Sequence, residues 1–351
     1  MDYPFPLDYE PEIDDPVIHD ELGPWLPDEI FDFHSHVYRD QDVPSRKGES
    51  RNPSMPHVCD YYPLENYLHA MEHLFPGKTL HALLFNTIDP AGDLRDQNEY
   101  LARVTADQPN LHALMLCGLS EDEEALEAEL RAGHFLGFKP YWSYVTHEHG
   151  VPQADVTLED MIPPGQRRLA DRLGLMQLVH IPRLGRLADP VNVDGMIRLC
   201  EQCPNSTIIM AHFGRAYFPE AVGDLKALPQ CDNLYIDFSM VQSWEACEIL
   251  IDRFGPDKIL FGLDMPVAQE KGKLLSANGQ RHFFTKRVHP WSIHNSAGTY
   301  KMRCTFYAYE IVRAFKVAAE RLGLSRQDVR NVFCDNGLRL VGETKSALGY
   351  E

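Results

Sequence analysis

Short apolar segments recur along the chain from Glu29 onward, and most are separated by stretches with helix-like periodicity or helix start signals. Eight such segments can be counted, each rich in branched and aromatic residues: 30–37, 80–87, 111–120, 136–144, 175–183, 207–214, 234–241 and 259–266. Near-continuous apolar runs of this length are typical of strands covered on both faces, as in a parallel sheet. Eight strands that alternate with helices across about 240 residues predict a (β/α)8 barrel.

An open, doubly wound sheet is the alternative architecture. No glycine-rich phosphate-binding motif follows any of the eight segments, so this alternative lacks support at its strand-to-helix turns. Helix signals lie between the segments. Residues 121–133 follow Ser120, with Glu123 three residues later as a capping box and Gly133 as a stop signal.

The ends of the chain and two long connections stand apart from this alternation. Residues 1–29 contain six prolines, ten acidic residues and no Lys or Arg, which predicts an extended acidic arm on the surface. We expect the barrel over residues 30–342 and a C-terminal tail over 343–351. The stretches 38–61 and 267–300 follow the first and eighth strands, so both are expected as long loops at the C-terminal mouth of the barrel.

Composition narrows the functional classes. With 351 residues, 44% of them hydrophobic and 24% charged, the chain is typical of a globular protein. The formal net charge of −19 disfavours a nucleic-acid partner. Because no run of 18 apolar residues and no secretory signal occur, we expect a cytoplasmic protein without a membrane segment. The eight cysteines are too sparse for a disulfide scaffold and are expected as free thiols, and a homo-oligomer remains open.

Polar groups suited to a metal site follow several of the predicted strands. His34 and His36 are two residues apart on the first strand, so both side chains leave the same face. His180, His212 and Asp264 each stand at the C-terminal edge of an apolar strand. A barrel brings those edges together around its axis, and a set of imidazoles with one carboxylate suits Zn²⁺, Mn²⁺ or Fe²⁺. A second His-x-His pair, 147 and 149, lies in a polar stretch and not at a strand end.

This pattern resembles the amidohydrolase superfamily, and specifically its amidohydrolase-related branch, which also holds decarboxylases such as those acting on aminocarboxymuconate semialdehyde. The resemblance covers residues 30–342 and is carried by five motifs: FDFHSHV, LVHIPR, IMAHFGR, ILFGLDMP and the closing CDNGLRL. It implies that His34, His36, His180 and Asp264 bind one divalent metal ion, with Zn²⁺ expected first and Mn²⁺ or Fe²⁺ as alternatives. It also implies that His212 is a catalytic histidine that polarises the substrate or activates water, while Asp264 holds or accepts the displaced proton.

Lys139 decides the expected metal count. It ends the fourth predicted strand, where binuclear members of the superfamily carry a carboxylated lysine that bridges two metals. In the amidohydrolase-related branch this position is generally not a bridge. We therefore expect a single metal and a Lys139 that contacts substrate, with a second metal only if Lys139 is carboxylated.

Three further residues are candidates for substrate contacts. Arg183 and Arg215 come three residues after His180 and His212, close enough to the mouth to hold a carboxylate, although either could pair with a surface acid instead. Tyr141 could line an aromatic wall or simply pack. The stretch 267–299 carries five Lys or Arg residues against one Glu, a local balance that favours a small anionic substrate.

The sequence therefore predicts a metal-dependent hydrolase that uses activated water on an ester, lactone or amide of a small, carboxylate-bearing compound. The first alternative is a metal-dependent non-oxidative decarboxylase of a small carboxylic acid, because both reactions use the same ligands. The second alternative is a catalytically silent barrel that binds a ligand, against which the retention of all five polar groups argues.

Overall fold

The structure is a computed structural model that describes residues 3–46, 58–294 and 303–350. Parallel strands form its centre and confirm all eight predicted segments. They are β1 (Glu29–His36), β2 (Thr79–Phe85), β3 (Leu111–Ala113), β4 (Gly137–Phe138), β5 (Met176–Val179), β6 (Thr207–Met210), β7 (Leu234–Asp237) and β8 (Ile259–Leu260).

Backbone hydrogen bonds join these strands into a ring. Strands β1–β3 and β4–β8 form two regular sheets. The amide of Met115, just after β3, donates to the carbonyl of Gly137 at 2.9 Å. On the other side, Phe33 donates to the carbonyl of Phe261 at 2.8 Å and His36 to that of Met265 at 2.9 Å. The predicted (β/α)8 barrel is confirmed, and its strand ends converge as the sequence argument required.

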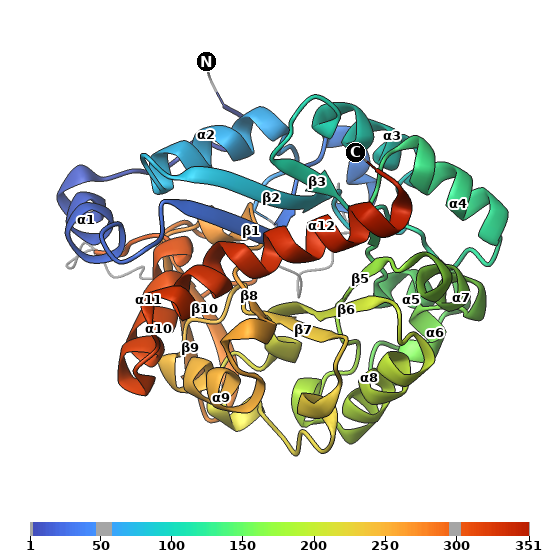
Figure 1. Cartoon of the computed structure of the whole chain (residues 1–351). Helices are drawn as coiled ribbons and strands as arrows, with labels where there is room; N and C mark the ends of the chain where they lie inside the picture. The colour runs from blue at the N-terminus through green and yellow to red at the C-terminus, as the bar shows by residue number, and fades with distance from the viewer. Residues whose placement is uncertain (1–2, 47–57, 295–302, 351) are drawn as a thin grey trace.

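Helices surround the ring, as Figure 1 shows. They are α2 (Leu64–Leu74), α3 (Leu94–Thr105), α4 (Glu123–Ala132), α5 (Trp142–His149), α6 (Leu158–Met161), α7 (Pro164–Leu173), α8 (Pro190–Gln202), α9 (Trp244–Phe254), α10 (Tyr307–Leu322) and α11 (Arg326–Arg330), whereas α12 (Asn336–Leu348) lies across one end of the ring. Between β6 and β7 the described chain forms no α-helix, because the short 3₁₀ turns η6 (Ala211–Arg215), η7 (Pro219–Ala221) and η8 (Leu228–Gln230) connect them. The N-cap of helix α4 is Asp122 and not Ser120, since the Asp122 carboxylate accepts from the amide of Ala125.

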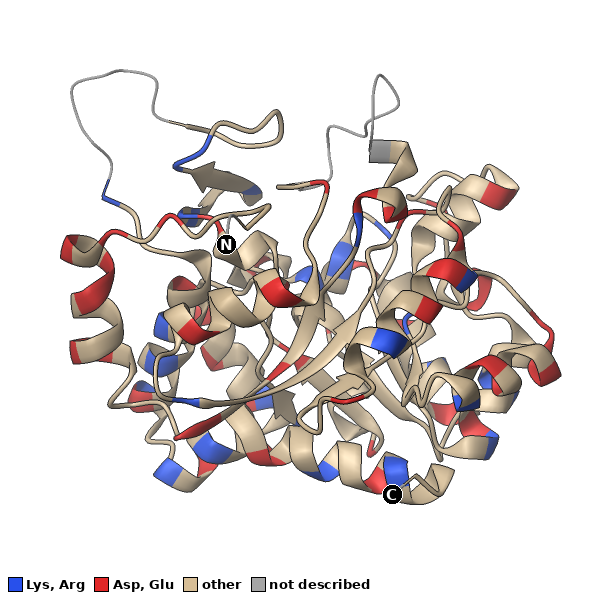
Figure 2. Ribbon diagram, turned by 90° about the horizontal axis from the view of Figure 1, so that it is seen from above, with Lys and Arg blue, Asp and Glu red and all other residues tan. Residues whose placement is uncertain are grey.

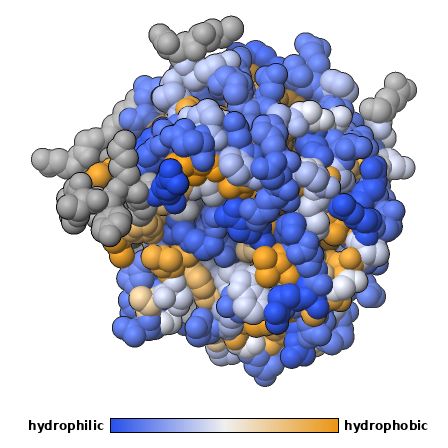
Figure 3. All heavy atoms as spheres, turned by 90° about the vertical axis from the view of Figure 1, so that its left-hand side faces the viewer, coloured by the Kyte–Doolittle hydropathy of each residue, from blue (hydrophilic) through white to orange (hydrophobic). Residues whose placement is uncertain are grey.

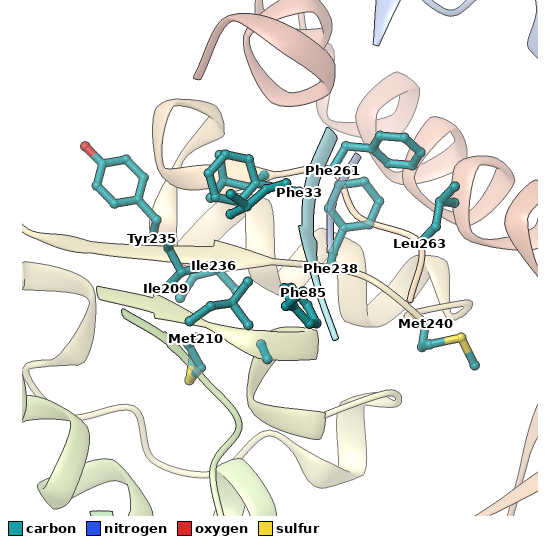
Figure 4. Packing of buried hydrophobic residues seen from close by; sticks show 14 of the residues in the cluster. Phe33, Phe85, Ile209, Met210, Tyr235, Ile236, Phe238, Met240, Phe261 and Leu263 are labelled. Carbon is teal, nitrogen blue, oxygen red and sulfur yellow. The ribbon is translucent and has the colours of Figure 1, made fainter. Parts of the chain in front are cut away.

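The barrel interior is packed with apolar side chains. Figure 4 shows part of this core, to which β1, β2, β6 and β7 and the segments after β7 and β8 contribute. Phe33, Phe85, Phe238 and Phe261 have no exposed surface. Each fully buried side chain of this size contributes about 2 kcal/mol through the hydrophobic effect. The strand ends that carry the candidate site therefore rest on a stable, close-packed floor.

The C-terminal helix closes the opposite end of the barrel. Helix α12 crosses the ring of strands in Figure 1, and a Cβ placed on Gly337 would lie only 2.7 Å from the ring of Phe31 near the start of β1. Glycine at 337 thus allows the close contact. The expected tail over 343–351 is wrong for residues 343–348, which complete α12 and bury Leu348.

The insertion after β8 contains a β-hairpin. Strands β9 (Gly272–Ala277) and β10 (Gln280–Thr285) pair in antiparallel fashion. Figure 2 shows this hairpin at the end of the molecule opposite α12, on the side of the C-terminal strand ends. The expected mouth loop over 267–300 is therefore largely ordered by strand pairing up to residue 294. The parts of the two expected loops at 47–57 and 295–300 lie outside the described residues.

The N-terminal arm is more structured than predicted. Residues 11–22 form α1 (Pro11–Asp15) and the π-helical turn η1 (Pro16–Leu22), so the expectation of an extended arm is wrong there. The sequence signal was misleading because prolines at 11 and 16 stand at first-turn positions, which helices tolerate.

Acidic side chains of the arm pair with bases from the far end of the chain. Buried Asp14 lies 2.6 Å from Lys271 Nζ, which also contacts Glu10 at 2.8 Å. Glu21 pairs with Arg313 on α10 at 2.7 Å. The surrounding face is mostly hydrophilic, with small separate apolar groups (Figure 3). The arm is thus held by charge pairing to the hairpin and α10.

The described residues contain no helix with the length and apolar character needed to cross a bilayer. All eight cysteines are free thiols, as predicted.

Candidate metal centre

A cavity of about 300 Å³ opens where the C-terminal ends of the strands meet. This volume suits a small organic molecule. Eight of the nine predicted site residues line it: His34, His36, Lys139, Tyr141, His180, His212, Arg215 and Asp264. The structure thus brings together residues that lie up to 230 positions apart in the chain.

Arg183 is the exception. Its Nε lies 2.9 Å from the carboxylate of Asp189, the residue that caps α8, and the side chain is not part of the cavity lining. This pairing with an acid is the alternative that the sequence left open for Arg183. Arg186, three residues later, lines the cavity instead.

The centre of the site is a cluster of imidazoles around Asp264. Asp264 Oδ1 lies 3.3 Å from His36 Nε2 and 3.7 Å from His34 Nε2. The rings of His34 and His212 are 4.4 Å apart, and His34, His212 and Asp264 offer ligand atoms within 4.8 Å of one another. The ring of His180 is 5.2 Å from that of His212. His34, His36, His180, His212 and Asp264 therefore form one group.

Local backbone geometry aims these side chains. The pairing of β1 with β2 shifts register between Asp32 and Ser35, a bulge that includes His34. His212 and Asp264 adopt positive φ angles of 55° and 68°, a region that costs non-glycine residues energy. Five of the nine non-glycine residues with positive φ in the described chain line the cavity: Arg186, His212, Arg215, Met240 and Asp264. Backbone strain is concentrated at this site.

Acceptors behind the rings fix the tautomers of two histidines. His34 Nδ1 lies 2.9 Å from a carboxylate oxygen of Asp237, and His36 Nδ1 lies 3.0 Å from the backbone carbonyl of Asn86. Carboxylates and carbonyls only accept hydrogen bonds, so each Nδ1 carries the proton. Each Nε2 then presents a lone pair toward Asp264. This is the arrangement of a metal-binding histidine oriented by a second partner.

His212 is oriented in the same way through Ser239. The hydroxyl of Ser239 donates to Asp237, so it accepts from His212 Nδ1 at 2.8 Å. The carbonyl of Ser239, 3.3 Å from the same nitrogen, also only accepts. His212 Nε2 is therefore unprotonated in the neutral ring and faces His34 and Asp264 as a base or a ligand.

Burial keeps the imidazoles neutral. It lowers the pKa of His34, His36 and His180, and nearby Lys139 or Arg215 lowers it further. Burial and His34 together lower the pKa of His212 to about 4. Burial would raise the pKa of Asp237, but His34, His212 and Ser239 together hold it at about 2. At neutral pH the cluster thus has basic nitrogens beside anionic carboxylates.

This donor set fits a divalent cation. The residues offer neutral imidazoles and one carboxylate, and the buried Nδ1 of His180 has no hydrogen-bond partner among the described residues. A cation would give such a nitrogen its missing partner. Nitrogen and oxygen ligands of this kind suit Zn²⁺, Mn²⁺ and Fe²⁺ alike.

Lys139 lies beside this cluster. Its Nζ is 3.3 Å from His34 Nε2, and burial lowers its pKa to about 7. The amine also lies 4.2 Å from the centre of the Phe85 ring. Lys139 is thus placed next to the cation-binding side of His34, within reach of a molecule in the cavity.

Sequence reasoning missed several residues of the site. Asp237 ends the apolar strand β7, just as His180 follows β5, so the same position at a strand end could have identified it. Its role depends on its contact with His34, which the sequence LYIDFSMV does not reveal. Ser239, Tyr217 and Arg186 carry no motif. Arg281 entered the prediction only through the charge balance of its segment.

The fold and the site define a metal-dependent (β/α)8 enzyme. A family model described as amidohydrolase matches residues 31–342. The chain belongs to this amidohydrolase family and is an enzyme of the amidohydrolase superfamily. A comparison with curated proteins gives no significant match.

Solved structures with the same fold include decarboxylases and a hydratase. 2,6-Dihydroxybenzoate decarboxylase from Rhizobium is 14% identical with a TM-score of 0.54, covering 90% of this chain and 98% of its own. 4-Oxalomesaconate hydratase from Rhodopseudomonas palustris is 17% identical with a TM-score of 0.53, covering 91% and 98%. 5-Carboxyvanillate decarboxylase from Novosphingobium aromaticivorans, with bound manganese, is 12% identical with a TM-score of 0.54, covering 89% and 97%. At these identities the likeness shows the shared fold.

Proposed function

We propose that the protein is a metal-dependent hydrolase of a small, carboxylate-bearing ester, lactone or amide. The observation that carries the proposal is the tautomer of His212. Its Nδ1 proton is held by Ser239, which leaves Nε2 as a base directed toward His34 and Asp264. A base in this position suits a reaction that consumes water.

We propose His34, His36, His180 and Asp264 as the ligands of one divalent cation. Zn²⁺ is expected first, and Mn²⁺ is supported by the manganese in the structurally similar 5-carboxyvanillate decarboxylase. Such a cation polarises a carbonyl and lowers the pKa of water.

The residues of the chain supply the remaining steps. His212 Nε2 accepts a proton from the attacking water, and Asp237 stabilises the resulting imidazolium through Ser239. The leaving group takes up the proton from His212. Lys139 and Arg215 hold the substrate in the cavity, and the ring of Tyr141, 4.7 Å from that of His180, forms a wall.

Non-oxidative decarboxylation is the second candidate. Two of the similar structures are decarboxylases of aromatic acids. The observation that favours it here is Lys139, a buried cation beside His34 that can hold a reacting carboxylate. In this reaction Asp264 or His212 would deliver a proton to carbon when CO₂ leaves, so the site residue must first be protonated.

The two reactions are separated by their products. We would load the protein with Zn²⁺ or Mn²⁺ and supply carboxylate-bearing esters, lactones, amides and aromatic acids. Hydrolysis releases acid without CO₂, and decarboxylation releases CO₂. The proposal predicts acid release that a chelator abolishes, and CO₂ release alone would establish the second candidate.

The ligand assignment is tested by His180→Ala. This variant should lose bound metal and activity together, measured by metal content per chain and by turnover. Retention of both would contradict the assignment. Two equivalents of metal in the wild type would instead indicate a carboxylated Lys139.

A further inference from the structure

The cavity has a second group of charged side chains besides the histidine cluster. Four of its lining residues are Lys or Arg, namely Lys139, Arg186, Arg215 and Arg281, whereas Asp264 is its single acid among the described residues. Lys139 and Asp264 belong to the metal end. The remaining positive charge comes from Arg186, Arg215 and Arg281, which we call the arginine wall.

The arginine wall is assembled from three separate elements. Arg186 begins the turn η5 (Arg186–Ala188) after β5, and Arg215 ends the turn η6 (Ala211–Arg215) after β6. Arg281 lies on β10 of the inserted hairpin. Arg186 and Arg215 both adopt positive φ angles, of 57° and 60°. Three elements and two unfavourable backbone conformations thus place guanidinium groups around one cavity.

Tyr217 links the arginine wall to the metal centre. The guanidinium carbons of Arg281 and Arg186 lie 4.6 and 5.8 Å from the centre of its ring. The same ring is 6.3 Å from the ring of His212. A molecule that reaches from His212 across Tyr217 therefore meets the arginines at its other end.

Among the described residues, these arginines have no acidic partner. In the described part of the chain, no carboxylate lies within ion-pair distance of any of the three, and Arg215 donates only to the carbonyl of Pro182, at 3.4 Å. Arg183 and Arg287, their neighbours in sequence, are both paired with acids. Burial and the charges of Arg281 and Arg215 lower the pKa of Arg186 to about 10. The wall is unfavourable in the empty cavity and becomes favourable when an anion binds.

We infer that the substrate carries a second, non-reacting carboxylate, bound by Arg186, Arg215 and Arg281, while its reacting group lies at the histidine cluster. The substrate class is a small dicarboxylate compound. This inference rests on the proposed function for the position of the reacting end. Arg281 contacts the ring of Tyr217, and that ring lies 6.3 Å from the ring of His212, so the wall offers a place for a carboxylate besides the one at the histidine cluster.

The test compares diacids with matched monoacids that do not react. Malonate, succinate, glutarate and isophthalate would be titrated calorimetrically into the manganese-loaded protein, with propionate, butyrate, pentanoate and benzoate as their partners and inorganic phosphate as a further probe. At least one diacid should bind about tenfold more tightly than its monoacid. Arg281→Gln and Arg186→Gln should each remove most of this preference without changing manganese content.

Control variants make the result specific. Arg253→Gln removes an equal charge from the last turn of α9, outside the cavity, and should leave diacid binding unchanged. Arg281→Lys should retain part of the preference because the charge remains. Equal binding of diacids and monoacids, an equal loss of both in Arg281→Gln, or tighter binding of phosphate than of every diacid would overturn the inference.

The same experiment separates this inference from the proposed hydrolase function. If the protein binds no metal and turns over no ester, lactone or amide, yet prefers diacids through Arg281, the proposed function fails and the arginine wall stands. If turnover is metal-dependent but the diacid preference is absent, only the arginine wall fails.

Discussion

The two ends of the cavity are built on different principles. The histidine cluster stands on barrel strands, and hydrogen bonds to Asp237, Ser239 and the Asn86 carbonyl fix the rings of His34, His36 and His212. The arginine wall stands on two turns and an inserted hairpin, with no acid partner among the described residues. The first end is pre-organised by hydrogen bonds to three of its histidines, and the second depends on a ligand for its counter-charge. We therefore expect the histidine cluster to carry out the reaction and the arginine wall to select the substrate, and mutations should affect the two roles separately.

The largest effect should come from removing the base at the histidine end. His212→Ala should lower turnover about 10³-fold, in the range usual for a lost general base, while metal stays bound. Turnover on the substrate found by screening and metal content per chain measure the two effects. Ser239→Ala keeps the imidazole but releases its tautomer, so a smaller loss is expected. Loss of metal in His212→Ala would show that His212 is a ligand.

The hairpin can be disturbed without touching the histidine end. Lys271→Met breaks the buried pair with Asp14 and should lower the free energy of unfolding by about 3–5 kcal/mol. Because Lys271 immediately precedes the strand that pairs with the strand of Arg281, the diacid preference should fall too, with manganese content unchanged. Lys273→Met, two residues further on in β9 and with a half-exposed side chain, is the control and should lower the free energy of unfolding less. A comparable loss of bound manganese in Lys271→Met would show that the two ends are coupled.

Asp237→Asn tests how far the histidine end depends on its supporting carboxylate. The metal affinity should fall about 10- to 100-fold, the usual effect of losing a residue that orients a ligating histidine. Competition with a chelator measures this affinity. The diacid preference of the variant should persist, provided that metal is supplied in excess. If it disappeared, the comparison between two separable ends would fail.

The smallest expected effects are on the pH dependence of stability, which should differ between His212 and the residues that anchor the hairpin. In the metal-free protein, His212 has a pKa of about 4 when folded against 6.5 as its ordinary value. The unfolded state then binds more protons between these values, so stability is complete above pH 6.5 and falls as the pH drops toward 4. Glu10, which anchors the hairpin through Lys271 and Lys286, has its pKa lowered to about 2 by those lysines. Its contribution is complete above pH 4.5 and is lost only below it.

Melting temperatures between pH 3 and 8 test this order. The metal-free His212→Gln variant should show a flatter profile between pH 6.5 and 4 than the wild type. The Glu10→Gln variant should differ from the wild type in slope only below pH 4.5. Identical slopes for wild type and His212→Gln above pH 4 would contradict the assignment of a buried, neutral His212.

The barrel and the metal end were largely predictable from the sequence. Buried parallel strands can be recognised in the sequence as apolar runs. A polar residue at the end of such a run, such as His180 or Asp264, indicates a functional site because the C-terminal strand ends of a barrel carry the active site. The bulge in β1 and the roles of Asp237 and Ser239 were not predictable, because they depend on contacts between residues of different strands.

The arginine wall was the part of the site that the sequence predicted least well. Arg183 and Arg186 differ by three positions in one loop, yet the first is paired with Asp189 and the second lines the cavity. Arg186 also has a positive φ angle of 57°, which no local sequence pattern indicates. The arm was misjudged for a related reason, since its acids are paired with lysines and an arginine more than 250 positions away.

That long-range pairing has a consequence for how the protein is made. Asp14 is fully buried, and its partners Lys271 and Thr305 emerge from the ribosome only after most of the chain has been synthesised. An unpaired carboxylate is costly to bury, so residues 10–14 are translated before the barrel strands but dock after most of them. A nascent chain arrested before residue 271 should leave its N-terminus open to proteases, whereas the completed chain protects it.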